Sequence, residues 1–122
     1  MSVIVTDTGF GPDVAAEWLD LAPDADIDVV MRGSPIRQPI RIDFPGFADG
    51  RGFTLARLLR LRGYRGVLRA KGHVIADQYA MARRAGFDEV EIDDDLARRQ
   101  PQDQWLARAD WQRHDYQTRL RG

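Results

Sequence analysis

Two residues in the middle of the chain could do acid–base or nucleophilic chemistry: Lys71, the single lysine, and His73. A lysine amine can neutralise an anion or, when desolvated, act as a base or form an imine. Asp77 follows His73 by four residues, so on a helix its carboxylate would face the imidazole and fix the tautomer. We take Lys71, His73 and Asp77 as candidate catalytic residues. The alternative is a solvated lysine, a capping histidine and an aspartate in the positive first turn of a helix.

A glycine-rich segment, residues 45–52, contains a second set of candidates. Exposed backbone N–H groups and a guanidinium can hold an anion, so we expect a phosphate or sulfur oxyanion to bind there. The ligand-binding residues of this hypothesis are Asp49, Gly50, Arg51 and Gly52. The segment lacks the third glycine of the dinucleotide fingerprint, and the chain has no Gly-Lys-Ser/Thr. Alternatively, the glycines only permit a tight strand-to-helix turn that Asp49 caps.

The remaining polar clusters do not predict a metal or a redox group. Asp93-Asp94-Asp95 could bind a hard cation but lacks the calcium-loop spacing, so we expect a solvated helix start. His114 has no second histidine nearby. The chain contains no cysteine, which excludes disulfides, thiol catalysis and cysteine-held iron–sulfur clusters. We therefore expect no metal and no cofactor, and a colourless protein.

Hydrophobic periodicity and turn signals predict the elements that position these residues. We expect strand, helix, strand, helix and strand at residues 42–44, 54–61, 67–70, 74–85 and 90–92. Strands joined by a helix in one sheet are normally parallel with right-handed crossovers. This predicts an α/β fold, a small single domain with a parallel βαβαβ core, either flavodoxin-like or a half-barrel-like array that pairs with itself. Asp49, Arg51, Lys71, His73, Asp77 and the acidic run should then share one rim of the sheet.

The flanking segments are less regular. Val3–Thr6 is predicted as a strand, Asp13–Leu21 as a helix whose Trp18 is buried, and Asp28–Met31 as a strand. The C-terminal tail, residues 96–122, should be helical to Ala107 with a break at Pro101. Its aromatic side chains either fold back on the body, which we expect, or fit a groove of a partner.

The helical stripes and the strands together predict a hydrophobic core. Its members are Ile42, Phe44, Leu55, Leu58, Leu59, Val67, Leu68, Ile75, Tyr79, Val90 and Ile92, with Trp18 closing one side.

Composition places the chain among soluble globular proteins. Its 122 residues are 43% hydrophobic and 30% charged, one domain covering residues 1–122 is expected, and no apolar run could cross a membrane. The N-terminus shows no export signal, so we expect a cytoplasmic protein. Every charged residue before Arg32 is acidic, whereas residues 31–90 contain twelve Arg or Lys against five Asp or Glu. This basic middle could attract nucleic acid, phosphates or an acidic partner, or simply occupy solvated helix faces, and we expect no nucleic-acid partner.

Several short strings together resemble a bacterial domain-of-unknown-function family. They are Asp43 to Phe53, Ala56 to Arg60, Gly63 to Gly66, Leu68 to Ala70, Gly72 to Gln78, Gly86 to Asp88 and Tyr116-Gln117. The resemblance covers mainly residues 42–92. The chain departs from the family pattern at His73, where Asp or another residue is expected, and in a shorter N-terminal part.

The resemblance implies a pathway more than a mechanism. Genes of that family commonly neighbour assimilatory sulfite reductase, and its members are often labelled oxidoreductases involved in sulfite reduction. We therefore expect an accessory protein of sulfite reduction that binds a sulfur oxyanion or docks on the reductase or another sulfur-assimilation enzyme, with a homodimer as a further expectation. The alternatives are an oxyanion- or phosphate-binding enzyme and a structural interaction module. Whether the protein is an enzyme is left open by the sequence.

Overall fold

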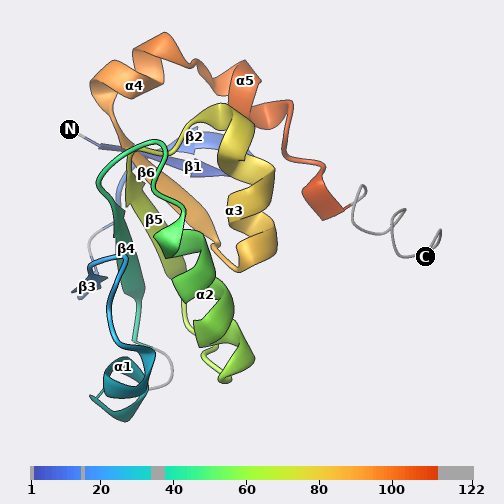
Figure 1. The fold of residues 1–122 in the computed structure, drawn as a ribbon. Helices are drawn as coiled ribbons and strands as arrows, with labels where there is room; N and C mark the ends of the chain where they lie inside the picture. Colours follow the sequence, from blue (N-terminus) through green and yellow to red (C-terminus); the bar gives the residue numbers. More distant parts are fainter. Residues whose placement is uncertain (1, 15, 34–37, 113–122) are drawn as a thin grey trace, which may run out of the picture.

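The computed structural model describes residues 2–14, 16–33 and 38–112, and these residues form an α/β fold around one six-stranded sheet (Figure 1). The strands are β1 (Ser2–Thr6), β2 (Gly9–Gly11), β3 (Leu19–Leu21), β4 (Ile40–Phe44), β5 (Leu68–Gly72) and β6 (Glu89–Asp93). Their order across the sheet is β2-β1-β6-β5-β4-β3. β3 to β6 are parallel, and β1 is antiparallel to both of its neighbours. The predicted fold class and the parallel βαβαβ core are confirmed.

Helices link the successive parallel strands. They are α1 (Ile27–Gly33), α2 (Arg51–Leu61), the short 3₁₀ helix η1 (Ala76–Gln78) followed by α3 (Tyr79–Ala85), and then α4 (Asp94–Arg99) and α5 (Gln102–Leu106) after β6. Each parallel strand adjoins the next one in chain order, whereas a flavodoxin-like sheet reverses its order at a switch point. The topology therefore agrees with the half-barrel-like alternative. None of the described helices is long and apolar enough to cross a bilayer.

The alternation of side chains along each strand gives the sheet two unlike faces. On β4, Ile40, Ile42 and Phe44 are buried beneath the helices, while Arg41 and Asp43 point to the other side. β5 and β6 repeat this alternation. The helix-covered face is apolar. The opposite face, here called the polar face, carries the charged side chains Arg41, Asp43, Arg69, Lys71, Glu89 and Glu91.

The core between helices and sheet contains most of the predicted residues, but four predictions are wrong. Leu58 is 40% exposed, because α2 buries Gly52, Leu55, Ala56 and Leu59, and the helical period turns Leu58 away from the sheet. Val67 is 41% exposed, because Leu68 next to it faces the helices and adjacent strand residues point to opposite sides. Trp18 is only partly buried and lies on the polar face, and Ile75 is also partly buried.

The expected helix at residues 13–21 is wrong. The described residues between Pro12 and Trp18 have no regular structure, and Leu19–Leu21 forms the edge strand β3. Pairing decides this, because β3 lies parallel to β4 with Leu19 opposite Ile40 and Leu21 opposite Ile42. Leu19 and Leu21 alternate with Asp20, a period-two pattern that the helical interpretation overlooked.

The expected strand at residues 28–31 is also wrong, since these residues belong to α1. The Asp26 carboxylate accepts a hydrogen bond from the Asp28 N–H at 2.9 Å, as a helix cap does. Asp28 in the first turn and Arg32 in the last complement the helix dipole. These signals at the two ends of the helix outweigh the preference of the β-branched residues Val29 and Val30 for a strand.

The described part of the tail, up to residue 112, packs on the body. The Trp105 side chain is 1% exposed, packs edge-on against Tyr79, and donates its Nε1–H to the Gln100 carbonyl at 2.9 Å. Trp111 donates a hydrogen bond to the Asp7 carboxylate at 3.3 Å. Leu106 stays 39% exposed. His114, Tyr116 and Gln117 lie outside the described residues.

One edge of the sheet is covered by the tail. The Gln102 Oε1 of α5 accepts a hydrogen bond from the backbone N–H of Phe10 in β2 at 2.8 Å. The same side chain fits against Gly9, where an added Cβ would lie 2.5 Å from Gln102 Oε1. Gly9 also has a φ of +112°, a conformation that favours glycine.

Candidate functional site

A cavity of about 220 Å³ lies where β5 and β6 end, at the carboxyl edge of the parallel strands. Open parallel sheets bind ligands at this edge because loops and strand ends converge there. The residues around the cavity, here called the edge cavity, are Ser2, Phe47, Lys71, Gly72, His73, Glu91, Ile92, Asp93, Leu96 and Arg99. Two of the three candidate catalytic residues, Lys71 and His73, therefore line the same cavity.

Of the two permanently charged cations in the edge cavity, Lys71 and Arg99, Lys71 has the longer ion-pair distance. It stands between Asp43 and Glu91 on the neighbouring strands, and its side chain is 46% exposed. Its Nζ lies 3.8 Å from Glu91 Oε2, which is longer than a hydrogen bond. Glu91 itself is engaged by Arg41 at 3.1 Å and Arg69 at 2.8 Å. The amine is therefore available to a ligand anion.

A tight turn after β5 positions His73. Gly72 has a φ of +116°, and a Cβ there would meet the Phe44 carbonyl oxygen at 2.8 Å, so glycine is required. The His73 backbone N–H donates to that same oxygen at 3.0 Å, and ring Nδ1 lies 3.1 Å from it. Because the carbonyl can only accept, Nδ1 carries the proton, and the neutral ring presents the Nε2 lone pair elsewhere. The ring also packs edge-on against Phe47, with the centroids 4.9 Å apart.

The expected pair between His73 and Asp77 is wrong. The helix begins at Ala76, so His73 precedes it and the two residues do not share a helical face. His73 is held by Phe44, while the Asp77 carboxylate forms an ion pair with Arg108 beyond α5. Asp77 is therefore not among the residues that line the edge cavity.

The four glycine-loop candidates are also outside the edge cavity. Arg51 lies 2.9 Å and 2.7 Å from the two carboxylate oxygens of Asp49 through Nε and Nη2, and it lines a separate hollow with Pro23 to Ala25. Hydrogen bonds from Arg51 lower the pKa of the Asp49 carboxyl. Asp49 also accepts from the Arg51 backbone N–H at 3.1 Å, so this carboxylate already occupies the start of α2.

Packing accounts for the glycine at position 52. A Cβ on Gly52 would lie 2.5 Å from Cζ of the Phe44 ring, so glycine lets α2 approach the sheet closely. Gly50 is the N-cap residue of α2, and no atom lies within 4 Å of the position its Cβ would take. The turn interpretation of this segment, given as the alternative above, fits this geometry.

The acidic run starts α4, as expected. Asp93 accepts a hydrogen bond from the Leu96 N–H at 2.7 Å and caps the helix, and Asp95 forms ion pairs with Arg98 and Arg99. Asp93 and Arg99 line the edge cavity. No cluster of three or more His, Cys, Asp or Glu suited to a metal ion occurs within residues 2–14, 16–33 and 38–112.

The polar face adjoining the edge cavity is an ion-pair network that sequence reasoning missed. The Arg69 side chain is 3% exposed and contacts Asp13 at 2.9 Å, Glu89 at 2.8 Å and Glu91 at 2.8 Å. The Trp18 ring lies over its guanidinium, 4.1 Å from the ring centroid to Cζ. The alternation Glu89-Val-Glu-Ile-Asp93 signals such a face, because it puts three carboxylates on one side of a strand.

A larger cavity of about 580 Å³ lies at the opposite, amino edge of the strands. Two of its three arginines make structural contacts: Arg60 donates to the carbonyls of Gly86, Tyr64 and Gly66, and Arg83 donates to the carbonyl of Phe87. Arg65, also in its wall, forms no hydrogen bond or ion pair with the described residues. We favour the edge cavity as the site, because it lies at the carboxyl edge of the parallel strands and places the Lys71 amine beside the His73 ring.

The model of a family described as bacterial protein of unknown function (DUF934) matches residues 19–122. The chain belongs to this family. In this DUF934 member the matched residues include the whole parallel sheet from β3 to β6 and every residue of the edge cavity except Ser2. No curated protein and no solved structure matches the chain.

Proposed function

We propose that the protein is an accessory protein of assimilatory sulfite reduction that binds a small sulfur oxyanion in the edge cavity. The observation that carries the proposal is the convergence of Lys71, His73 and Arg99 on one hollow at the carboxyl edge of the sheet. The cavity is below the ~300 Å³ at which pockets for drug-sized ligands begin, which suits a small anion. The resemblance described above supports the pathway.

Lys71, Arg99 and His73 each have a distinct role in this proposal. Lys71 supplies three N–H donors and a positive charge beside the ligand. Arg99 is bound to Asp95 at 3.0 Å but is 64% exposed at its side chain, so it can also reach an anion at the mouth. His73 presents Nε2, which donates a hydrogen bond to the oxyanion when the ring is protonated.

A second candidate function is an enzyme that removes a proton from a small anionic substrate. The tautomer of His73 favours it: with Nδ1–H held by the Phe44 carbonyl, Nε2 of the neutral ring is an acceptor in the same cavity as Lys71. A general base needs such a lone pair within hydrogen-bond reach of the substrate proton. His73→Gln would abolish turnover by such an enzyme, while Lys71 and Arg99 would still attract the anion.

Thermal denaturation with added anions tests the binding site. Sulfite, sulfate, phosphate and chloride are compared at equal ionic strength, and a ligand that binds only the folded state at 100 times its Kd adds about 2.7 kcal/mol of stability. We expect stabilisation by sulfite that is lost in Lys71→Ala. Arg51→Ala is the matched control, because Arg51 is bound to Asp49 outside the cavity. Equal shifts with chloride, or loss in Arg51→Ala alone, would contradict the site.

Growth of the bacterium that encodes the protein tests the pathway. A deletion strain should fail to grow on sulfite as the only sulfur source and should grow on sulfide, and the wild-type gene should restore growth. The Lys71→Ala gene should fail to restore it. Normal growth of the deletion strain on sulfite would reject the accessory role, independently of anion binding.

A further inference from the structure

Two of the helices that cover the sheet, α2 and α3, carry positive charge without any acidic residue. α2 contains Arg51, Arg57 and Arg60, and α3 contains Arg83 and Arg84, but neither helix contains Asp or Glu. The acidic residues of the chain lie mainly on the N-terminal segment, the polar face and α4. The surface formed by α2 and α3 is therefore basic.

Three of these five arginines are occupied by neighbouring groups. Arg51 binds Asp49, while Arg60 and Arg83 bind backbone carbonyls and the carboxylate of Asp88. Arg57 and Arg84 are exposed and form no ion pair or hydrogen bond with the described residues. Within the part of the chain that the structure describes, these two guanidinium groups have no anionic partner.

Apolar side chains stand beside the two free arginines. Leu61 is 77% exposed, Met81 is 53% exposed and Leu58 is 40% exposed. On α2, Leu61 lies four residues after Arg57 and three after Leu58, so all three share one side of the helix, and Met81 and Arg84 share a side of α3. α2 and α3 lie against each other in Figure 1. We call Arg57, Leu58, Leu61, Met81 and Arg84 the helical surface.

We propose that the helical surface docks an acidic amphipathic segment of a partner protein. Charge complementarity argues for an acidic partner, because the guanidinium groups of Arg57 and Arg84 pair with no described residue and neither helix contains an acid. The exposed leucines and methionine argue for a protein. Arg and Met are enriched at protein interfaces, whereas surfaces that bind single-stranded nucleic acid present aromatic rings for base stacking. The helical surface has no such ring.

The proposal goes beyond the oxyanion site and does not depend on it. The edge cavity is formed by β5, β6 and α4, whereas the helical surface belongs to α2 and α3. One site can fail its test while the other passes.

Binding of designed peptides tests the proposal. A fluorescent amphipathic helical peptide with Glu on one side and Leu on the other is titrated with the full chain, alongside a Lys/Leu peptide and a Glu/Ser peptide of equal length. We expect binding of the Glu/Leu peptide alone, weakening with added salt as charge pairing requires. Amide chemical-shift changes should fall on α2 and α3.

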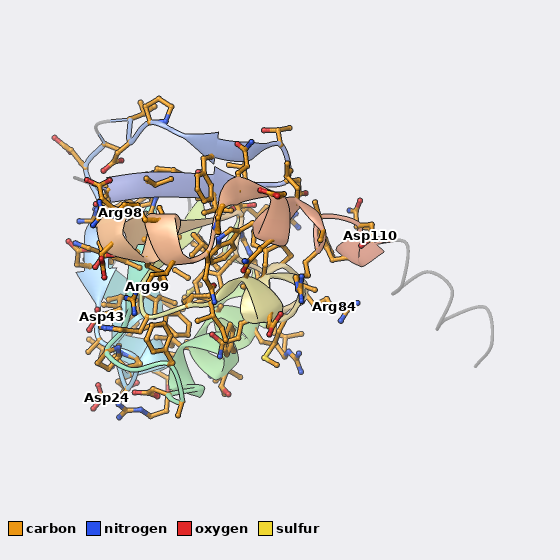
Figure 2. All side chains as sticks on the ribbon, turned by 90° about the horizontal axis from the view of Figure 1, so that it is seen from above. Asp24, Asp43, Arg84, Arg98, Arg99 and Asp110 are labelled. Carbon is orange, nitrogen blue, oxygen red and sulfur yellow. The ribbon has the colours of Figure 1, made fainter. Side chains whose placement is uncertain are left out.

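Charge-reversal and apolar variants locate the binding. Arg57→Glu, Arg84→Glu and Leu61→Ser should each weaken binding about tenfold, the effect of losing ~1.4 kcal/mol. Arg98→Glu on α4 and Leu106→Ser on α5 are matched controls that change exposed residues elsewhere and should leave binding unchanged. Figure 2 shows Arg84 and Arg98 on well-separated parts of the surface. Unchanged melting temperatures confirm that all variants fold.

Four outcomes would overturn the proposal. One is equal loss of peptide binding in Arg98→Glu. The second is binding of the Glu/Ser peptide as tight as that of the Glu/Leu peptide. The third is binding of a DNA oligonucleotide or of phosphatidylglycerol vesicles that depends on Arg57 and Arg84 while the Glu/Leu peptide does not bind. The fourth is concentration-dependent self-association that Leu61→Ser abolishes, which would make the surface a contact between copies of this chain.

Discussion

The helix-covered face and the polar face use the same strands but bury different groups. On β5, Leu68 and Ala70 pack under the helices, while Arg69 between them is equally inaccessible on the polar face. The first face is held by non-directional apolar burial. The second depends on a guanidinium whose carboxylate partners come from distant parts of the chain. The two faces should therefore respond differently to the loss of one side chain.

The largest effect is expected on the polar face. Arg69→Met should destabilise the fold by ~3–5 kcal/mol, because it leaves the buried carboxylate of Glu91 with less positive charge. Arg98→Met, which breaks an ion pair between side chains 72% and 62% exposed, should cost at most ~1 kcal/mol. Urea denaturation of both variants measures the difference. Equal losses of stability would mean that water reaches the polar face and that burial does not strengthen the ion pairs of Arg69.

On the helix-covered face, the neighbouring residues Leu59 and Leu58 of α2 allow a buried position to be compared with an exposed one. Leu59→Ala should cost ~2–5 kcal/mol, because Leu59 is fully buried and leaves a cavity. Leu58→Ala should cost less than ~1 kcal/mol, the usual level for surface changes. The two values come from urea denaturation at one pH. A larger loss at Leu58 would contradict the phase of α2 in the structure.

A smaller effect is expected at Tyr64, which joins the end of α2 to the sheet. Its single hydroxyl proton lies within reach of two carbonyl acceptors, those of Val67, at 2.9 Å, and Gln38, so Tyr64→Phe should lose ~0.5–1.5 kcal/mol near pH 7.

The stability of the protein at alkaline pH gives a second test of the Tyr64 hydroxyl. Burial raises the pKa of Tyr64 to about 12, above the value near 10 for an unfolded tyrosine. The neutral hydroxyl therefore stabilises the fold fully below pH about 10, and that contribution is lost as the pH rises toward about 12. Over this window the wild type should lose more stability than Tyr64→Phe. Parallel losses in the two proteins would show that the hydroxyl ionises equally in both states.

The comparison of faces also explains which parts of the fold could be predicted from the sequence. The βαβαβ core was predicted because its apolar residues recur with helical or strand periods and glycines mark the junctions, as at Gly63 and Gly86. Helix 13–21 and strand 28–31 were wrong because β3 is fixed by pairing with β4 and α1 by its capping aspartate. In the local sequence, the pairing of β3 with β4 is marked only by the three-residue alternation Leu19-Asp20-Leu21.

Part of the candidate site could also be predicted from the sequence, because the position of each strand end follows from the predicted topology. Lys71 and His73 follow from topology, since a strand end in a parallel sheet lies at the ligand-binding edge. Asp77 and Arg51 were misplaced because each binds a nearby opposite charge, Arg108 and Asp49, and a side-chain partner is not visible in spacing. Ser2 and Arg99 were missed because β1 and α4 reach the cavity from opposite ends of the chain.

The cover that Gln102 gives to β2 has a consequence for assembly. An unpaired strand edge is a template on which strands of other chains can add, and such addition leads to aggregation. Here the amide of Phe10 is already bonded, and Gly9 is shielded by the same side chain. At the other border, β3 is only three residues long, so it offers a strand of ~10 Å at most. The sheet is thus protected against growth into fibrils at both borders, by a side chain at one and by shortness at the other.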